Sequence, residues 1–147
     1  MATEYNAYRD AYSSINPTPC AFEKGILTQC VACELAEKHL LAERETINCH
    51  DVEAWQLCED LRKILRIRAA FSLKLVKLDG ELLPHGQEIK VQCGGLLGLQ
   101  QALDGTKEIT NVHRLVLDAI MRYADLTSFP YSEIVRTIVH FSLRRRN

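Results

Sequence analysis

The sequence lacks a long hydrophobic run and carries almost no net charge, and each absence excludes a class of protein. Its apolar stretches are interrupted by Lys, Glu or Gly every few positions, well short of the roughly 18 to 20 residues that a transmembrane helix needs. The formal net charge of -1 gives no overall field that would attract nucleic acid or anionic lipid. We therefore expect no membrane partner, and nucleic acid is not the expected ligand.

The N-terminal residues also lack the basic start, the apolar stretch and the small-residue cleavage site of a secretory signal. We accordingly expect a cytoplasmic protein. Because that compartment is reducing, the cysteines are expected to bind metal, take part in redox chemistry or be buried as small hydrophobic side chains, and a disulfide framework is not expected.

Catalytic and nucleotide-binding motifs are missing as well. The Gly94-x3-Gly98 pattern lacks the lysine and the further glycines of a phosphate-binding or dinucleotide-binding loop. Neither a G-x-S-x-G nor an H-E-x-x-H pattern occurs. We therefore predict no catalytic residues and favour a non-enzymatic role.

The composition that is present fits an ordinary globular protein. Hydrophobic residues make up 47% of the 147 residues and charged residues 25%, which is typical of a chain that buries a core. We expect one domain over residues 1–147, with a cysteine-rich helical part at about 20–70 and a hairpin with C-terminal helices at about 71–147.

Apolar periodicity predicts a mainly α (α+β) fold of four or five helices with a small two-stranded β-hairpin. Tyrosines at helical spacing indicate an aromatic helix at about residues 5–15. Pro19 favours a helix from about Cys20 to Glu43, and Asp51 is a suitable N-cap for the next one.

The later part of the chain is expected to contain the hairpin. Apolar and polar residues alternate over 71–75 and 89–93, which predicts two strands with a turn at Asp79-Gly80 between them. Further helices are expected to begin near Gly94, at Thr110 or Asn111, and near Ser128.

Five of the six cysteines lie between Cys20 and Cys58. Cys30 and Cys33 form a C-x2-C pair on the apolar face of the first predicted helix, and Cys58 lies on the core side of the second. Cys49 precedes the second helix, where the helix dipole lowers the pKa of a thiol. Antiparallel packing of these helices predicts that Cys30, Cys33, Cys49 and Cys58 ligate one metal centre.

Cys20 is the alternate ligand. Ten residues of helix, about 15 Å, would separate it from Cys30, so it reaches the site only if the helix begins later or if an irregular turn folds it back. With a helix start near Glu23, Cys20 could replace Cys30. His39 and His50 are possible imidazole ligands, although solvent exposure or hydrogen bonding is the simpler interpretation.

Four thiolates can hold either a zinc ion or an iron–sulfur cluster. Structural zinc sites commonly combine two short C-x2-C pairs, whereas here one pair is followed by single cysteines sixteen residues (49 − 33) and nine residues (58 − 49) further on. Clusters accept more varied spacing, so the pattern favours iron–sulfur.

Other interpretations of these residues stay open. The cysteines could be inert core residues, and a thioredoxin-like use of the C-x2-C pair conflicts with its predicted place inside a helix. Cys93-Gly94-Gly95 could cover the metal site with backbone N–H groups or form a tightly packed turn. The arginines at 144–146 are expected at a solvated helix end.

The sequence therefore predicts a small cytoplasmic iron–sulfur protein with a 4Fe-4S cluster that acts in electron transfer, in redox sensing or as an accessory to another metalloprotein. Its partner would be another protein, either a redox partner or a metalloenzyme. The alternatives are a zinc-stabilised helical module that binds protein or nucleic acid, and a metal-free helical adaptor.

Overall fold

The computed structural model describes residues 17–74, 84–103, 105 and 108–142, and this part of the chain is mostly helical. The elements are α2 (Glu23–Leu27), β1 (Ala36–Leu41), β2 (Arg44–Cys49), α3 (Val52–Leu73), α4 (His85–Ile89), the π-helical turn η1 (Lys90–Gly94), α5 (Gly95–Ala102), α6 (Val112–Tyr123), the 3-10 turn η2 (Leu126–Ser128) and α7 (Tyr131–His140). The predicted fold class, mainly helical with a two-stranded antiparallel hairpin, is confirmed.

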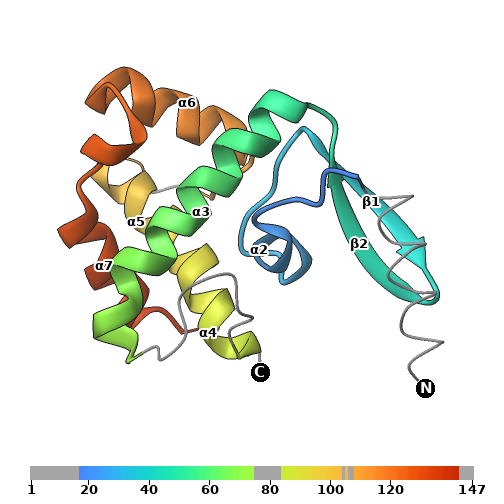
Figure 1. Ribbon diagram of the computed structural model, residues 1–147, viewed down its shortest axis with the longest axis horizontal. Coiled ribbons are helices and arrows are strands. Elements are labelled where there is room, and N and C mark those ends of the chain that lie inside the picture. The colour runs from blue at the N-terminus through green and yellow to red at the C-terminus, as the bar shows by residue number, and fades with distance from the viewer. Residues whose placement is uncertain (1–16, 75–83, 104, 106–107, 143–147) are drawn as a thin grey trace.

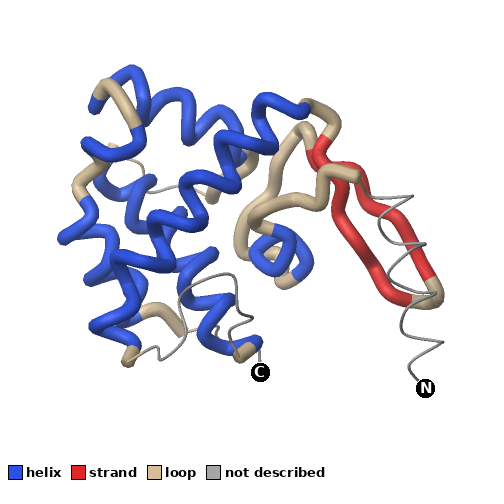
Figure 2. The backbone as a smooth tube through the Cα atoms, in the orientation of Figure 1, coloured by secondary structure: helices blue, strands red, loops and turns tan. Residues whose placement is uncertain are grey.

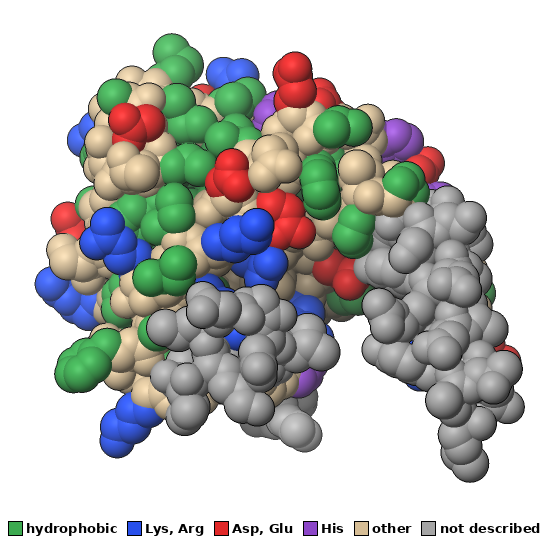
Figure 3. Space-filling view, in the orientation of Figure 1, with side chains coloured by type: hydrophobic (Ala, Val, Ile, Leu, Met, Phe, Trp, Pro, Cys, Tyr) green, Lys and Arg blue, Asp and Glu red, His purple; other side chains and the backbone are tan. Residues whose placement is uncertain are grey.

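The long helix α3 runs diagonally across the molecule (Figure 1). Helices α5, α6 and α7 lie on one side of it, and α4 lies at the bottom of the view. The β1–β2 hairpin projects on the other side, with α2 between α3 and the hairpin (Figures 1 and 2). Charged and hydrophobic side chains are interspersed over the face that α3 crosses (Figure 3). None of the described helices is long and apolar enough to cross a membrane.

Helix α3 begins where the sequence predicts. The Asp51 carboxylate accepts hydrogen bonds from the backbone N–H groups of Glu53 and Ala54, at 2.9 and 3.2 Å, which satisfies two N-terminal donors. Its buried stripe includes Cys58, Leu61 and Leu65. The helix continues to Leu73, so the strand predicted from Phe71 is wrong. Phe71 is 92% exposed while Leu73 packs against the core, so the two side chains do not share a buried face as they would in the predicted strand.

The helix predicted over 20–43 is also wrong. Only Glu23–Leu27 is helical, and Gln29 adopts a positive φ of 65° that ends it. The chain then forms the hairpin, whose two turn residues, Ala42 and Glu43, have positive φ angles of 51° and 67°. Turns of this kind usually contain Asn or Gly, so neither the turn nor the helix-favouring composition of β1 indicated a hairpin.

The hairpin predicted over 71–93 is therefore misplaced. Residues Ile89, Val91 and Cys93 lie in the continuous helical segment formed by α4, η1 and α5, where Val91 and Cys93 are fully buried. When a helix is buried on several sides, a short apolar stretch of its sequence cannot be distinguished by periodicity from a buried strand. The turn predicted at Asp79-Gly80, the aromatic helix at 5–15 and the terminal arginines lie outside the described residues.

The last two helices follow the sequence prediction. Asn111 precedes α6, and α7 buries Ile134 and Ile138. Both helices pack on the core formed with α3, η1 and α5. This helical body gives α3 and the residues before α6 a fixed position from which they can present side chains to the hairpin.

Gly94 and Gly98 allow helix α7 to approach η1 and α5 closely. A Cβ atom on Gly94 would lie 2.7 Å from the Ile138 Cα, and one on Gly98 would lie 3.0 Å from the Ile134 Cα. Since both neighbours are backbone atoms, they cannot rotate away. Of the two interpretations of Cys93-Gly94-Gly95, close packing is therefore the one that these distances support.

We expect Gly94→Ala to lower the free energy of unfolding by about 1–3 kcal/mol, because α7 must move outward to admit the methyl group. Gly86→Ala is the matched control: Gly86 is exposed in α4, a Cβ atom there meets nothing within 4 Å, and the change should raise stability by up to about 1 kcal/mol. Urea denaturation of both variants measures the difference. Equal stabilities would contradict the packing argument.

Candidate metal centre

Cys20 is placed by backbone pairing with the end of β2. The Cys20 N–H donates to the Ile47 carbonyl at 2.9 Å, and the Cys49 N–H donates to the Thr18 carbonyl at 2.8 Å. The indole Nε1 of Trp55 also donates to the Pro19 carbonyl at 2.7 Å, which ties this segment to α3. These bonds set Cys20 and Cys49 side by side on adjacent segments.

Cys33 is placed by the loop over residues 28–35. The Ala32 N–H donates to the Ile109 carbonyl at 2.9 Å, and the Val112 N–H donates to the Ala32 carbonyl at 3.0 Å. The Cys33 thiol itself donates to the Asn111 side-chain oxygen at 3.3 Å. The loop is thus fastened to the segment that precedes α6, and Cys33 lies at that junction.

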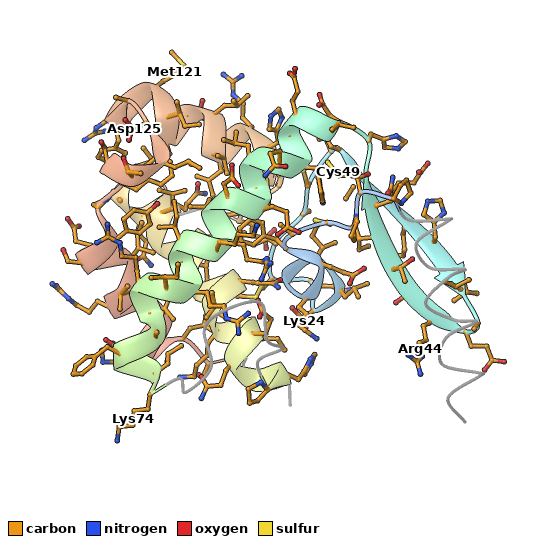
Figure 4. All side chains as sticks on the ribbon, viewed as in Figure 1. Lys24, Arg44, Cys49, Lys74, Met121 and Asp125 are labelled. Carbon is orange, nitrogen blue, oxygen red and sulfur yellow. A yellow bond between two sulfur atoms is a disulfide. The ribbon has the colours of Figure 1, made fainter. Side chains whose placement is uncertain are left out.

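Cys49 and Cys58 complete the group from β2 and α3. Cys49 is the last residue of β2 and lies next to the start of α3 (Figure 4), where its thiol donates to the Asp51 carbonyl at 3.3 Å. Cys58 lies on the buried face of α3, two turns further along, and is 9% exposed. The helix therefore presents Cys58 toward the end of the hairpin.

The four thiols line one cavity. Its other walls are mainly apolar, and the complete lining comprises Cys20, Ala21, Phe22, Cys33, Ala36, Cys49, Ala54, Trp55, Cys58, Val112 and His113. All four cysteines are free. The cavity volume is about 20 Å³, room for about one water molecule, so a larger group would require the thiols to move apart.

The cavity is not a preformed site for a single ion. Among the described residues, no group of three or more His, Cys, Asp or Glu side chains is arranged to hold a metal ion. The structure does bring four possible metal ligands together: the four free cysteine thiols, which come from four separate segments. The other residues that line the cavity are mainly apolar and offer few further ligand atoms. Thiolates of this kind bind soft metals and iron–sulfur clusters.

Burial raises the pKa of three of these thiols, those of Cys20, Cys49 and Cys58, and so favours their protonated form when no cation is present. Burial, and next the nearby Cys33 and Cys49, raise the pKa of Cys20 to about 12, although a backbone hydrogen bond at Phe22 opposes the rise. Burial also raises the pKa of Cys58, and repulsion from Cys20, Cys33 and Cys49 adds to the effect. The mutual repulsion of the four as thiolates is the electrostatic reason for a cation to bind between them.

The low pKa expected for Cys49 from the helix dipole is wrong. Burial raises its pKa, and repulsion from Cys33 and Asp51 contributes in the same direction. A backbone hydrogen bond at Asp51 only partly opposes this. Desolvation of the thiolate therefore outweighs the favourable position before α3.

Of the predicted ligands, the structure brings together Cys33, Cys49 and Cys58, but not Cys30. Cys30 is bonded to Cys93 in a disulfide, which also contradicts the expectation that no disulfide would form. Cys20 takes its place beside the other three thiols. This follows from the later helix start: α2 begins at Glu23, the condition under which Cys20 could replace Cys30.

The two candidate histidine ligands lie elsewhere. His39 and His50 both contact the Glu37 carboxylate, at 3.1 and 3.3 Å, on the surface of the hairpin. The histidine that does line the cavity is His113, and the sequence analysis missed it. His113 stands two residues after Asn111, one of the two positions predicted to start this helix, but no spacing in the sequence links the start of α6 to the cysteines.

Comparison with known proteins adds no identification. The sequence matches no family model, and no curated protein or solved structure matches it.

Proposed function

We propose that Cys20, Cys33, Cys49 and Cys58 bind a 4Fe-4S cluster. The observation that supports this is the convergence of four free thiols, from four separate segments, on one largely apolar cavity. Cysteine thiolates are the usual ligands of such clusters. The cluster would supply one-electron chemistry, while the chain supplies the four ligands and encloses them.

The spacing of these four residues favours a cluster over zinc. Successive ligands are 13 (33 − 20), 16 (49 − 33) and 9 (58 − 49) residues apart. With Cys30 in a disulfide, no two of the four belong to the short C-x2–4-C pairs that are typical of structural zinc sites. A cluster is larger than an ion and can be reached from separated segments.

The surroundings support a redox role. Phe22, which is fully buried, lines the cavity together with Trp55 and Val112, and these apolar walls would limit the access of water to the site. An apolar surround and limited solvent exposure are among the factors that set a cluster's potential. Cys33 and Cys49 are half-buried, so one side of the site lies near the surface. We propose that the protein acts in the cytoplasm in one of three roles. It would transfer electrons, sense the redox state, or act as an accessory to another metalloprotein.

The test is anaerobic purification of the full chain without added reductant. We expect about four iron and four acid-labile sulfide atoms per chain and a brown colour that dithionite bleaches, as for a 4Fe-4S centre. Trp55, the only tryptophan, lines the cavity, so its fluorescence should be quenched in the iron-loaded protein. Colourless protein with one zinc per chain would refute the cluster and support a zinc-stabilised module.

A further inference from the structure

The Cys30–Cys93 disulfide lies next to the proposed metal centre along the chain. It joins the loop over residues 28–35 to η1, across a sequence separation of 63 residues. Cys33, a member of the four-thiol group, is three residues from Cys30 on the same loop. Among the described residues this is the one disulfide, and it ties the loop to a helical segment far along the chain.

The two cysteines differ in exposure. Cys93 is fully buried in η1. Cys30 is half-buried and lines an open cavity of about 370 Å³, whose lining is Ile26, Gln29, Cys30, Val31, Ala32, Glu108, Ile109 and Thr110. A thiolate that enters this cavity can therefore reach Cys30, while Cys93 is shielded.

Thr28 and Gly25 contact the disulfide. The Thr28 hydroxyl lies 3.8 Å from the Cys30 sulfur and 3.9 Å from the Cys93 sulfur, close enough to contact either one. Gly25 packs against both sulfur atoms, since a Cβ atom there would lie 3.7 Å from each. Its N–H also donates to the Gln92 side chain at 3.0 Å, which would keep α2 beside η1 after the S–S bond opens.

The disulfide is the covalent anchor of the loop, and hydrogen bonds hold it as well. The Ala32 backbone bonds to Ile109 and Val112, the Glu34 N–H donates to the Asn111 side-chain oxygen at 3.3 Å, and the His50 N–H donates to the Leu35 carbonyl at 2.9 Å. Cys33 follows Ala32 directly, and only its weak thiol contact to Asn111 positions the side chain. Opening the disulfide removes the covalent anchor and leaves the position of Cys33 to the hydrogen bonds alone.

We propose that Cys30–Cys93 is a thiol-exchange site for a dithiol reductant, attacked at Cys30, and that its reduction loosens the placement of Cys33 in the four-thiol site. One thiolate of the dithiol attacks the Cys30 sulfur, the S–S bond breaks, and Cys93 leaves as a thiolate that takes up a proton. The second thiol of the reductant then resolves the mixed disulfide, which releases Cys30 and makes the reductant a disulfide. The consequence for metal retention rests on the proposed function; the exchange reaction does not.

The site of attack is tested by exposing the folded, as-isolated chain to glutathione and mapping the adduct by mass spectrometry. A mixed disulfide on Cys30 is expected. Glutathione on Cys93, or no adduct under native conditions, would overturn the proposed exchange site.

The coupling to Cys33 is tested in metal-free protein by its rate of alkylation with iodoacetamide. We expect a rise of at least about fivefold, the lower end of usual coupling between sites, when dithiothreitol opens the disulfide and equally in the Cys30→Ala/Cys93→Ala variant. Cys58, buried on α3, is the internal control and should keep its rate. An unchanged Cys33 rate, or an equal rise at Cys58, would overturn the coupling.

The same double variant separates this inference from the proposed function. In iron-loaded protein it should release iron to a chelator at least about fivefold faster than the wild type. If the chain binds no iron but the Cys33 alkylation rate still responds to the disulfide, the cluster proposal fails and the coupling stands. If iron is bound and its release does not respond, the coupling fails and the cluster stands.

Discussion

Replacing Cys20, Cys33, Cys49 or Cys58 with alanine is expected to reduce the iron content of anaerobically purified protein about tenfold or more. Each substitution removes one of the four free thiols that line the cavity. Because ligand binding contributes directly to folding energy at such sites, the variants should also unfold at a lower temperature than the loaded wild type. Iron analysis and thermal unfolding measure the two effects.

Cys30→Ala is the matched control, because Cys30 lies on the same loop as Cys33 but is not one of the four proposed ligands. Cys30 is bonded to Cys93, whereas Cys33 lines the cavity. It should retain most of its iron when purified, even though its iron is more easily extracted. Loss of iron from Cys30→Ala together with full retention in Cys20→Ala would show that the ligand set is Cys30, Cys33, Cys49 and Cys58 after all.

Alkaline pH is expected to destabilise the metal-free protein and to leave the loaded protein largely unaffected. Above pH 9 the thiols of the unfolded chain ionise, while burial keeps Cys20 protonated in the folded state up to a pKa of about 12. The folded state then binds more protons, so its stability falls as pH rises from about 9 to about 12. Because a pKa difference of one corresponds to about 1.4 kcal/mol, Cys20 alone accounts for on the order of 4 kcal/mol.

The measurement is the unfolding temperature against pH, without reductant, for metal-free and loaded protein. Ligation keeps the thiolates deprotonated in the loaded state, so the two curves should diverge above pH 9. Metal-free Cys20→Ala should show a smaller decline than the metal-free wild type, since it lacks that thiol. Parallel curves for loaded and metal-free protein would show that these thiols are not the ligands.

The sequence predicted elements whose signals are local. Asp51 starts α3 because one side chain satisfies the first N–H groups of the helix, and that depends on residues only two and three positions away. The start of α6 directly after Asn111 was also predicted from a short-range pattern, although the Asn111 side chain forms no capping hydrogen bond.

The hairpin depended on contacts that no local pattern contains. Strand β1 is stabilised by pairing along its whole length with β2, from Ala36 opposite Cys49 to Leu41 opposite Arg44. Its own residues favour a helix at least as well, so tertiary pairing decided the conformation. The same applies to the Cys30–Cys93 bond, which joins residues 63 positions apart.

The sequence predicted that the candidate site consists of cysteines, but it did not predict correctly which four cysteines form it. The density of cysteines between Cys20 and Cys58 indicated a thiol site, and three of the four expected residues do meet. The exchange of Cys30 for Cys20 depended on where α2 begins, because only the extended backbone over residues 18–20 can pair with β2 and bring Cys20 beside Cys49.

The most direct test of the central claim is a map of protected thiols in the iron-loaded protein. The full chain, purified anaerobically, is alkylated before and after its iron is removed by a chelator, and each cysteine is quantified by mass spectrometry. We predict that Cys20, Cys33, Cys49 and Cys58 react only after removal of the iron, while Cys30 and Cys93 stay unlabelled as a disulfide throughout. Full labelling of any of the four in iron-loaded protein would contradict the assignment.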